Sequence, residues 1–305
     1  MASLPASLPF PLPLIGVAVG AGAPDEGCAD GPQALIDVGL LTQLTDAGIA
    51  PDWIGPVTAP RRSDGAEPLA TIASLCATLA DRTESLARER RPFASLGGDH
   101  SAAIGLWSGA ARAVRPERFG LIWIDAHMDA HTFATTPSRM IHGMPVACLL
   151  GHGEARLTGL AGGDAAVAPE NLCLIGTRSF EEGEAALLAR LGVRIIAMEE
   201  VARRGFAAAL SEALAIAGEG TARFGVSLDI DAFDPADITG TGLHVPDGLH
   251  PNDVLQGFRL LREPAMAAKL AGLELAEYNP HSDRDGATAR LIGDLIAAAF
   301  ALHRR

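Results

Sequence analysis

The chain has 305 residues, of which 48% are hydrophobic and 20% charged, and its formal net charge at pH 7 is −13. This composition is typical of a soluble globular protein, and the negative charge argues against nucleic acid and anionic membranes as partners. No apolar stretch reaches the ~20 residues that a membrane helix needs, and the N-terminus lacks the basic residues of a signal peptide. We therefore expect a cytoplasmic protein whose ligands are cationic, metal ions included.

Short apolar runs alternate along the chain with longer Ala- and Leu-rich segments, which is typical of repeated βαβ units. We expect strands at Leu14–Val19, Phe93–Leu96, Leu121–Ile124, Leu172–Ile175, Ile195–Met198, Phe224–Leu228 and Leu273–Ala276. We expect helices at Pro68–Arg90, Ala102–Val114, Glu182–Leu191, Phe206–Ala217, Pro251–Leu261 and Ala287–Leu302. The pattern predicts an α/β fold with a mostly parallel central sheet and helices on both of its faces.

Three of the expected strands end in residues that could ligate a metal. GGDHS at 97–101 follows the strand at 93–96, DAHMDAH at 125–131 follows the strand at 121–124, and DIDAFDP at 229–235 follows the strand at 224–228. Ligands of open α/β sheets bind at the carboxyl ends of the strands. In an extended segment, Asp125, His127, Asp129 and His131 would share one face, since side chains alternate.

The charges of these motifs favour bound cations. No Lys or Arg lies within the second or third motif, although Asp125, Asp129, Asp229 and Asp231 bring four negative charges. Buried carboxylates are costly without a counter-charge, and two divalent cations would balance these four. Oxygen ligands with some imidazole suit Mn²⁺ and related first-row ions better than structural zinc.

Taken together and in this order, the three motifs resemble those of the ureohydrolase family, which includes arginase, agmatinase and related amidinohydrolases. The resemblance extends to LIGVAVGAGAPDEGCADGPQAL at 14–35, HGMP at 142–145, GTRSFEEGE at 176–184, TGTG at 239–242 and LELAEYNP at 273–280, and it is nearer to arginase than to agmatinase. It implies one ureohydrolase domain over residues 1–305 with a three-layer α/β/α fold. It also implies a homo-oligomer, trimeric or hexameric, and two Mn²⁺ ions per chain, with Ni²⁺, Co²⁺ or Fe²⁺ as alternatives.

Carried over by position, the resemblance implies a ligand set for each ion. His100, Asp125, Asp129 and Asp229 would hold one, and His127, Asp125, Asp229 and Asp231 the other. Two such ions ~3.5–4 Å apart activate a shared water for attack on a guanidino carbon, which releases urea and an amine. Three residues would be catalytic: Asp129, Glu277 as the carboxylate that binds the guanidinium, and His142 as the proton shuttle.

The substrate contacts implied by the resemblance fall at His131, Thr136, Ser138, Met140, Glu181, Glu184 and Thr241. Arginases carry Asn at the positions of His131 and Met140, and they place acids against the α-amino group where this chain has Glu181 and Glu184. We expect L-arginine as the substrate, hydrolysed to ornithine and urea. Guanidinobutyrate, guanidinopropionate and agmatine are the alternatives, because a site built for polar groups responds strongly to changes in its hydrogen-bonding residues.

Two competing interpretations concern the whole site. A single-zinc deacylase on a related sheet would use an Asp-x-His pair and one later Asp, without His100. A non-catalytic relative could keep metals for structure alone, although the presence of Glu277 and His142 argues against it.

Nearby charged residues have simpler expected roles. We expect Asp234, which precedes a proline, to cap a turn, and Glu199 and Glu200 to lie in a solvated loop. Arg178 could pair with a carboxylate near the site.

Overall fold

The computed structural model describes residues 11–163 and 165–301. Its strands form one eight-stranded sheet in the order β2-β1-β3-β8-β7-β4-β5-β6, and every neighbouring pair is parallel. The strands are β1 (Leu12–Ala18), β2 (Pro51–Thr58), β3 (Phe93–Leu96), β4 (Arg118–Ile124), β5 (Leu172–Ile175), β6 (Arg194–Ile196), β7 (Thr221–Asp229) and β8 (Leu270–Ala276).

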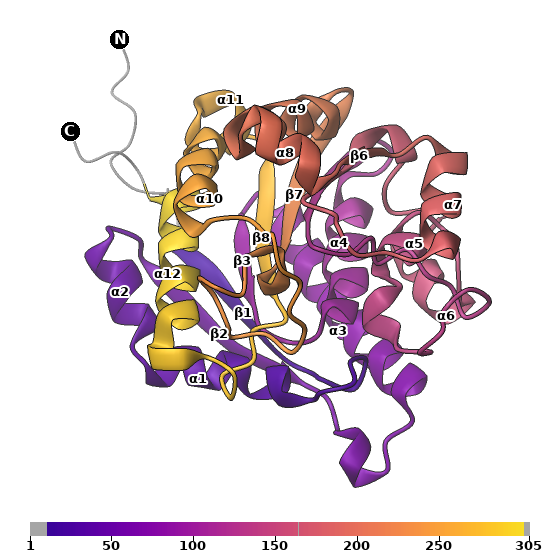
Figure 1. Cartoon of the computed structure of the whole chain (residues 1–305), viewed down its shortest axis with the longest axis horizontal. Helices are drawn as coiled ribbons and strands as arrows, with labels where there is room; N and C mark the ends of the chain where they lie inside the picture. Colours follow the sequence, from indigo (N-terminus) through magenta and orange to yellow (C-terminus); the bar gives the residue numbers. More distant parts are fainter. Residues whose placement is uncertain (1–10, 164, 302–305) are drawn as a thin grey trace.

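Helices cover both faces of this sheet, so the predicted three-layer α/β/α fold is confirmed (Figure 1). The helices are α1 (Gly31–Asp37), α2 (Leu40–Asp46), α3 (Pro68–Arg88), α4 (Ala103–Val114), α5 (Pro145–Leu149), α6 (Ala155–Thr158), α7 (Glu182–Leu191), α8 (Met198–Arg204), α9 (Phe206–Gly218), α10 (Pro251–Phe258), α11 (Pro264–Ala267) and α12 (Ala287–Phe300).

The hydrophobic core is divided by the sheet into two clusters. One cluster joins the sheet to α1, α2, α9, α10 and α12, and the other joins it to α3, α4, α5, α6 and α7. Central strands such as β3, β7 and β8 are almost completely buried, as expected when helices cover both faces of a parallel sheet. In the view of Figure 1, α12 (yellow) and α3 (purple) lie on opposite sides of these strands.

The structure differs from the expected elements at the two edges of the sheet, and it contains helices that were not expected: α1, α2, α5, α6, α8 and α11. The edge strand β2 was not expected, because its sequence PDWIGPVT contains two prolines and a glycine; an edge strand tolerates them, since one side needs no ladder hydrogen bonds. At the other edge, β6 ends at Ile196, and Glu199 and Glu200 lie in α8 rather than in a loop. Pairs four residues apart, such as Glu199 with Arg203, support this helix.

The last helix ends close to the limit of the described residues. Helix α12 ends at Phe300, and residue 302, where a longer helix was expected to end, lies outside the described residues. Within residues 11–163 and 165–301, no helix has both the length and the hydropathy to cross a membrane.

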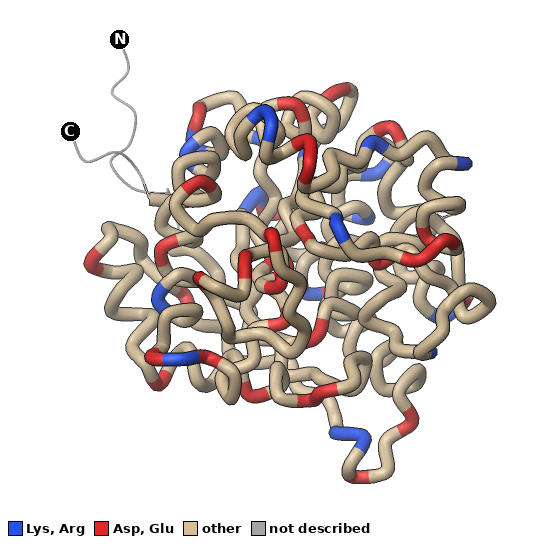
Figure 2. The backbone as a smooth tube through the Cα atoms, in the orientation of Figure 1, with Lys and Arg blue, Asp and Glu red and all other residues tan. Residues whose placement is uncertain are grey.

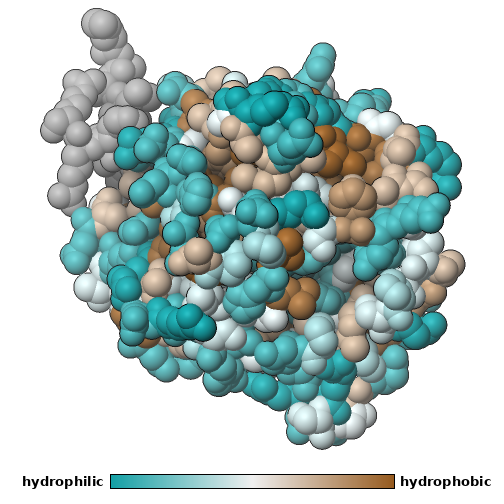
Figure 3. All heavy atoms as spheres, viewed as in Figure 1, coloured by the Kyte–Doolittle hydropathy of each residue, from teal (hydrophilic) through white to brown (hydrophobic). Residues whose placement is uncertain are grey.

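The sheet order explains why the three motifs meet. Strands β3, β8, β7 and β4 are consecutive neighbours at the centre of the sheet, so their carboxyl ends lie at one edge. The motif residues that follow β3, β4 and β7 are brought together there, next to the residue that follows β8, Glu277. Figure 2 shows acidic positions gathered near the centre of the molecule in this view, while Figure 3 shows mostly hydrophilic residues on the outer surface of the same side.

Candidate active site

The GGDHS turn brings His100 from the end of β3 into the site. Gly97 and Gly98 adopt φ values of 73° and 80°, a region that glycine enters without strain. A Cβ at Gly98 would lie 2.8 Å from the carbonyl oxygen of Val17, so the turn packs tightly against β1. Asp99 then caps the next turn by accepting a hydrogen bond of 3.0 Å from the backbone N–H of Ser101. The turn therefore holds the histidine at a fixed position.

His100 faces three carboxylates from two neighbouring strands. Its Nδ1 atom lies 3.1 Å from Oδ2 of Asp129, 3.1 Å from Oδ2 of Asp229 and 3.3 Å from Oδ2 of Asp125. All four side chains are buried. Nδ1 has no hydrogen-bond partner within the described part of the chain, although oxygen atoms surround it. A buried imidazole nitrogen that points at carboxylate oxygens without bonding to them fits a shared metal ion.

Three buried residues orient the His100 ring. Ser227 Oγ lies 2.8 Å from Nε2 of His100 and donates a hydrogen bond of 2.6 Å to Oε2 of Glu274. Trp123 stacks on the imidazole with ring centroids 4.1 Å apart. A hydrogen-bonded second ring nitrogen is the usual support of a metal-ligating histidine. Sequence analysis missed Ser227 and Glu274. Each is a polar residue inside an apolar strand, and Ser227 also lies on the same strand face as Asp229.

A second group of ligands shares Asp125 with the first. His127 Nδ1 lies 3.0 Å from Oδ2 of Asp231 and 3.5 Å from Oδ1 of Asp125. Trp123 Nε1 donates to Asp125 Oδ2 at 2.9 Å, which fixes this carboxylate between the two groups. The backbone N–H of Asp231 donates to Asp229 Oδ1 at 2.7 Å. The six sequence-predicted metal ligands therefore lie together in two adjacent groups that could each hold an ion: His100, Asp125, His127, Asp129, Asp229 and Asp231.

The electrostatics of the cluster favour cations. Burial and the charge of Asp125 raise the pKa of Asp129 to about 7. Burial, followed by the charges of Asp231 and Asp125, also raises the pKa of Asp229. Burial disfavours a charged His127, but hydrogen bonds to Asp125 and Asp231 outweigh it and raise the histidine pKa to about 12. Acids that resist ionising together, and a histidine that holds its proton, indicate an excess of negative charge, which divalent ions neutralise.

Glu277 and His142 form a pair beside this cluster. Oε1 of Glu277 accepts a hydrogen bond of 2.9 Å from the backbone N–H of His100 and lies 3.0 Å from Nδ1 of His142. Glu277 has a φ of 61°, and Asp129 a φ of 49°. Such values are uncommon for residues other than glycine, and strain of this kind collects at functional sites. The backbone N–H of Glu277 donates to the Gly98 carbonyl at 2.8 Å, which ties the strained residue to the GGDHS turn.

A cavity of about 310 Å³ opens in front of the metal-ligand cluster. His127, Asp129, Asp229 and Asp231 lie on its wall, together with His142. Ser179, Leu243, Pro24, Pro137 and Gly143, which sequence analysis did not single out, also line it. The volume is in the range of small-molecule sites.

His131 lies in the wall of this cavity between two glutamates. Its Nε2 atom is 2.9 Å from Oε2 of Glu181 and 3.4 Å from Oε2 of Glu184. Nδ1 lies 3.1 Å from the hydroxyl of Thr135. Glu184 also accepts a hydrogen bond of 3.0 Å from the backbone N–H of Ala130. The histidine is therefore held by partners on both of its ring nitrogens.

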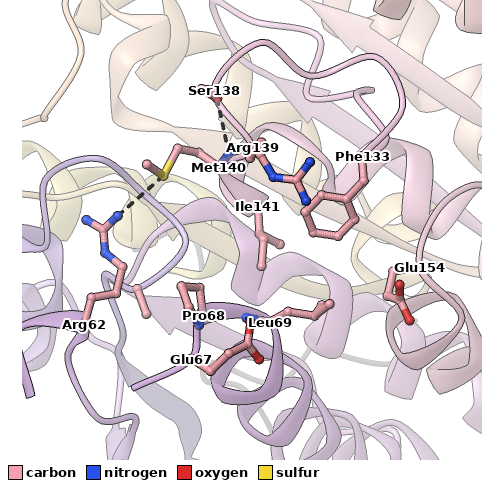
Figure 4. Close-up of a pocket in the computed structure, with 11 residues that line it drawn as sticks. Arg62, Glu67, Pro68, Leu69, Phe133, Ser138, Arg139, Met140, Ile141 and Glu154 are labelled. Atoms are coloured by element: carbon pink, nitrogen blue, oxygen red, sulfur yellow. Dashed lines mark hydrogen bonds between the residues drawn. The ribbon is translucent and has the colours of Figure 1, made fainter. Parts of the chain in front are cut away.

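Two residues of the loop before HGMP that were expected to contact the substrate lie on the wall of the active-site cavity. Ser138 and Met140 line it, and both also line a second cavity of about 520 Å³ on the other side of the loop. In Figure 4, the Met140 sulfur faces the Arg62 guanidinium, whose Nη1 lies 3.5 Å away, and Arg139 lies over the ring of Phe133. The loop thus separates two cavities.

Thr136 and Thr241, the other predicted contacts, are not among the residues that line the active-site cavity. The Thr136 hydroxyl is instead used inside the loop, where it accepts a hydrogen bond from the backbone N–H of Arg139 at 2.9 Å. Thr241 is buried, and no hydrogen-bond partner of its hydroxyl lies within the described residues.

Two further expectations have clear outcomes. Asp234 caps a turn as expected, since it accepts hydrogen bonds from the backbone N–H groups of Ala236 at 2.8 Å and Gly248 at 3.0 Å. Arg178 forms no ion pair with a carboxylate of the described residues: its guanidinium donates to backbone carbonyl groups, among them that of Asp231 at 3.0 Å. Arg178 therefore holds the backbone of the loop that carries the candidate ligand Asp231.

Comparison with known proteins agrees with this geometry. The family model described as the Arginase family matches residues 11–301. The chain is 34% identical to an arginase from Brevibacillus brevis over 292 residues, which covers 94% of this chain and 96% of that protein. Its fold superimposes on a crystal structure of arginase from Bacillus subtilis with a TM-score of 0.88 at 30% identity, covering 96% of this chain and 99% of that one. For arginase from Bacillus caldovelox the TM-score is 0.87 at 32% identity, with 97% and 99% covered. The chain therefore belongs to the arginase family.

Proposed function

We propose that this protein hydrolyses L-arginine to L-ornithine and urea with two Mn²⁺ ions. The observation that carries the proposal is the pair of adjacent ligand groups that share Asp125 at the wall of a cavity sized for a small molecule. The arginase names of its relatives support the reaction. The carboxylate and imidazole donors of both groups are those that Mn²⁺ accepts, with Ni²⁺, Co²⁺ and Fe²⁺ as alternatives.

When bound, the two ions supply a water molecule activated for attack on the guanidino carbon. His100, Asp125, Asp129 and Asp229 would hold one, and His127, Asp125, Asp229 and Asp231 the other. Asp129 would also orient the attacking water by accepting its hydrogen bond.

Glu277 would bind the substrate guanidinium. Its Oε1 atom already accepts from the His100 backbone and lies beside His142, while no described residue donates to Oε2. A charge-assisted hydrogen bond from the guanidinium to this free oxygen would orient the substrate. The Thr241 hydroxyl, which has no hydrogen-bond partner among the described residues, is a further candidate for this end of the substrate.

His142 would deliver a proton to the departing amine. Burial disfavours its charged form, but the hydrogen bond to Glu277 and nearby carboxylate charges outweigh burial and raise the His142 pKa to about 9. The imidazole is therefore protonated at neutral pH. Because Nδ1 is held by Glu277, Nε2 is the atom left to act as the general acid in the cavity.

His131, Glu181 and Glu184 would receive the polar tail of the substrate. Two carboxylates suit the α-ammonium group of arginine, and Ser138 adds a hydroxyl for the α-carboxylate. Met140 lies on the cavity wall. The family resemblance implies asparagine at this position, so methionine leaves the α-carboxylate with one polar partner fewer. This observation keeps guanidinobutyrate, guanidinopropionate and agmatine as alternative substrates.

The test is a urea-release assay on L-arginine, agmatine, guanidinobutyrate and guanidinopropionate, with Mn²⁺ and Ni²⁺ compared and bound metal measured per chain. We expect about two ions per chain and the highest kcat/KM for L-arginine with Mn²⁺. A higher kcat/KM for another guanidino compound would reassign the substrate. One tightly bound zinc with no urea from any of them would contradict the proposal and favour the deacylase interpretation.

Light scattering of the purified protein tests the remaining expectation, a homo-oligomer of three or six chains. A monomer at micromolar concentration would contradict it.

A further inference from the structure

A third cavity, with charged residues on its wall, lies at the opposite end of the sheet from the metal-ligand cluster. It has a volume of about 410 Å³, and its wall includes Arg88, Arg90, Glu117 and Arg223. Arg223 is the third residue of β7, so it lies near the amino end of this strand, whereas Asp229 is the last residue. Side chains alternate along a strand, so Arg223, Ser227 and Asp229 lie on one face of β7. The two cavities are therefore at opposite ends of the same strand face.

Arg223 is buried, and no carboxylate among the described residues forms an ion pair with it. Only 8% of its surface is exposed. Nη2 donates to the Leu270 carbonyl at 2.5 Å, but Nε and Nη1 have no hydrogen-bond partner among residues 11–163 and 165–301. Burial, and then the charge of Arg90, lowers the pKa of Arg223 to about 10, and no acidic group acts against this shift. An arginine that stays charged in such a position lacks both an anion and acceptors for its free N–H groups.

The protein groups around the cavity do not meet this need. Arg88 is paired with Glu84 at 2.6 Å, so that carboxylate is already used. Glu117 is exposed and forms no ion pair with the described residues. The carboxyl ends of α3 and α4, at Arg88 and Val114, place weak negative dipoles nearby, but their carbonyl oxygens do not accept from Nε or Nη1 of Arg223.

We infer that this cavity is a binding site for a small oxyanion, of the sulfate or phosphate type, held by the buried guanidinium of Arg223 and by Arg90 at its rim. Arg223 lines the cavity, and its charge would attract the anion. Nε and Nη1 are enclosed by protein in this structure, so a small rotation of the guanidinium towards the cavity would let them donate to the anion, whose charge and hydrogen-bond geometry a guanidinium group matches. The bound anion would stabilise the folded chain, because it binds the native state and not the unfolded one. This inference does not depend on the activity proposed above.

The experiment titrates sulfate against the metal-loaded protein and follows its melting temperature, with chloride at matched ionic strength as the reference. We expect the melting temperature to rise with sulfate beyond the chloride reference. Arg223→Met removes the buried charge but keeps an unbranched side chain. It should raise the melting temperature at low sulfate and abolish the sulfate response, whereas a merely structural arginine would destabilise the protein when replaced.

Arg90→Asn provides a variant that does not disturb the core, since Arg90 is exposed and asparagine tolerates its φ of 56°. We expect this variant to weaken sulfate binding by about tenfold or more, through loss of a charged partner. The matched control Arg203→Gln removes the same charge from the exposed surface of α8 and should bind sulfate as the parent chain does.

Three outcomes would overturn the inference: no difference between sulfate and chloride in the parent chain, the same sulfate response in Arg223→Met, or an equal loss of affinity in Arg203→Gln. A carboxylate from a second copy of the chain could also reach Arg223. In that case sulfate and Arg223→Met would both dissociate an oligomer, which light scattering during the titration detects, and the small-anion site would be wrong.

Discussion

The hydroxyl of Ser227 lies 2.8 Å from Nε2 of His100, and it donates its only proton to Glu274. Trp107 Nε1 donates to the same Glu274 oxygen at 2.9 Å, so that oxygen acts as an acceptor. With its proton on Glu274, Ser227 is placed to accept from His100, which assigns the imidazole proton to Nε2. Nδ1 is left with a free electron pair directed at Asp125, Asp129 and Asp229. The buried hydrogen bonds of Ser227 and Glu274 thus set the His100 tautomer that can ligate a metal.

Replacing Ser227 by alanine tests this relationship. The change removes the acceptor that fixes the His100 tautomer and leaves Glu274 with Trp107 as its donor. We expect the affinity for Mn²⁺ to fall about 10- to 100-fold, as for other losses of support behind a metal ligand. A competition titration with a chelating dye measures it. Activity should recover at saturating Mn²⁺. Unchanged affinity would mean that Ser227 does not orient the ring.

Glu277→Gln tests the division of roles between metal and substrate binding. The variant keeps the shape of the side chain but removes its charge, so we expect metal content to stay near that of the parent chain. The kcat/KM for guanidine hydrolysis should fall by about 10²-fold or more, because charge-assisted hydrogen bonds to the guanidinium are lost. Urea release and elemental analysis of the same sample measure both quantities.

The control for this variant is Glu263→Gln, which removes a carboxylate from an exposed position outside the cavity. It should leave both metal content and urea release unchanged. Loss of metal from Glu277→Gln would instead assign Glu277 to the metal centre.

His131→Asn tests whether the substrate tail is read at this position. The variant loses the contacts of Nε2 with Glu181 and Glu184 but gains an amide N–H that can donate to a carboxylate. We expect the ratio of kcat/KM for L-arginine over agmatine to rise by roughly tenfold, mostly through KM. The value of kcat should change little, since His131 does not contact the metal-ligand groups. A collapse of kcat together with metal loss would contradict this role.

The acid stability of the protein should depend on Glu200 of α8. Arg194 Nη2 donates to its Oε1 atom at 2.6 Å, and Arg204 bonds to the same oxygen. These contacts, that of Arg194 first, lower the Glu200 pKa from 4.5 to about 2. A lowered folded-state pKa gives stability that is complete above the unfolded pKa and is lost as the pH falls towards the folded value. The relevant window is therefore from about pH 4.5 down to about 2.

Urea unfolding of the parent chain and of Glu200→Gln between pH 7 and pH 3 measures this contribution. The variant should be less stable at pH 7, and the difference should shrink as the pH falls through the window. Arg194→Gln, which removes the first partner of Glu200, should behave in the same way. A difference that stays constant over this range would show that the ion pairs do not stabilise the fold.

Much of the site was readable from the sequence because its signals are local. The spacing of Asp125, His127 and Asp129 after an apolar strand, and of Asp229 and Asp231 after another, identified candidate ligands without knowledge of their neighbours. The buried strands and long amphipathic helices were also predicted, since their periodicity is set by the residues themselves. Elements at the sheet edges were predicted less well: β2 depends on pairing with β1 more than on its own propensity.

What the sequence by itself determined is the chemistry of the individual side chains and their order along the chain. Only the tertiary structure decided which of them meet. The strand order β3-β8-β7-β4 brings His100, Glu277, Asp229 and Asp125 to one edge from segments far apart in sequence. The same order places Ser227 behind His100, His131 between two glutamates, and Arg223 on the wall of a cavity where no described carboxylate pairs with it. These relationships arise from sheet order and burial, and neither is encoded by the spacing of residues within one motif.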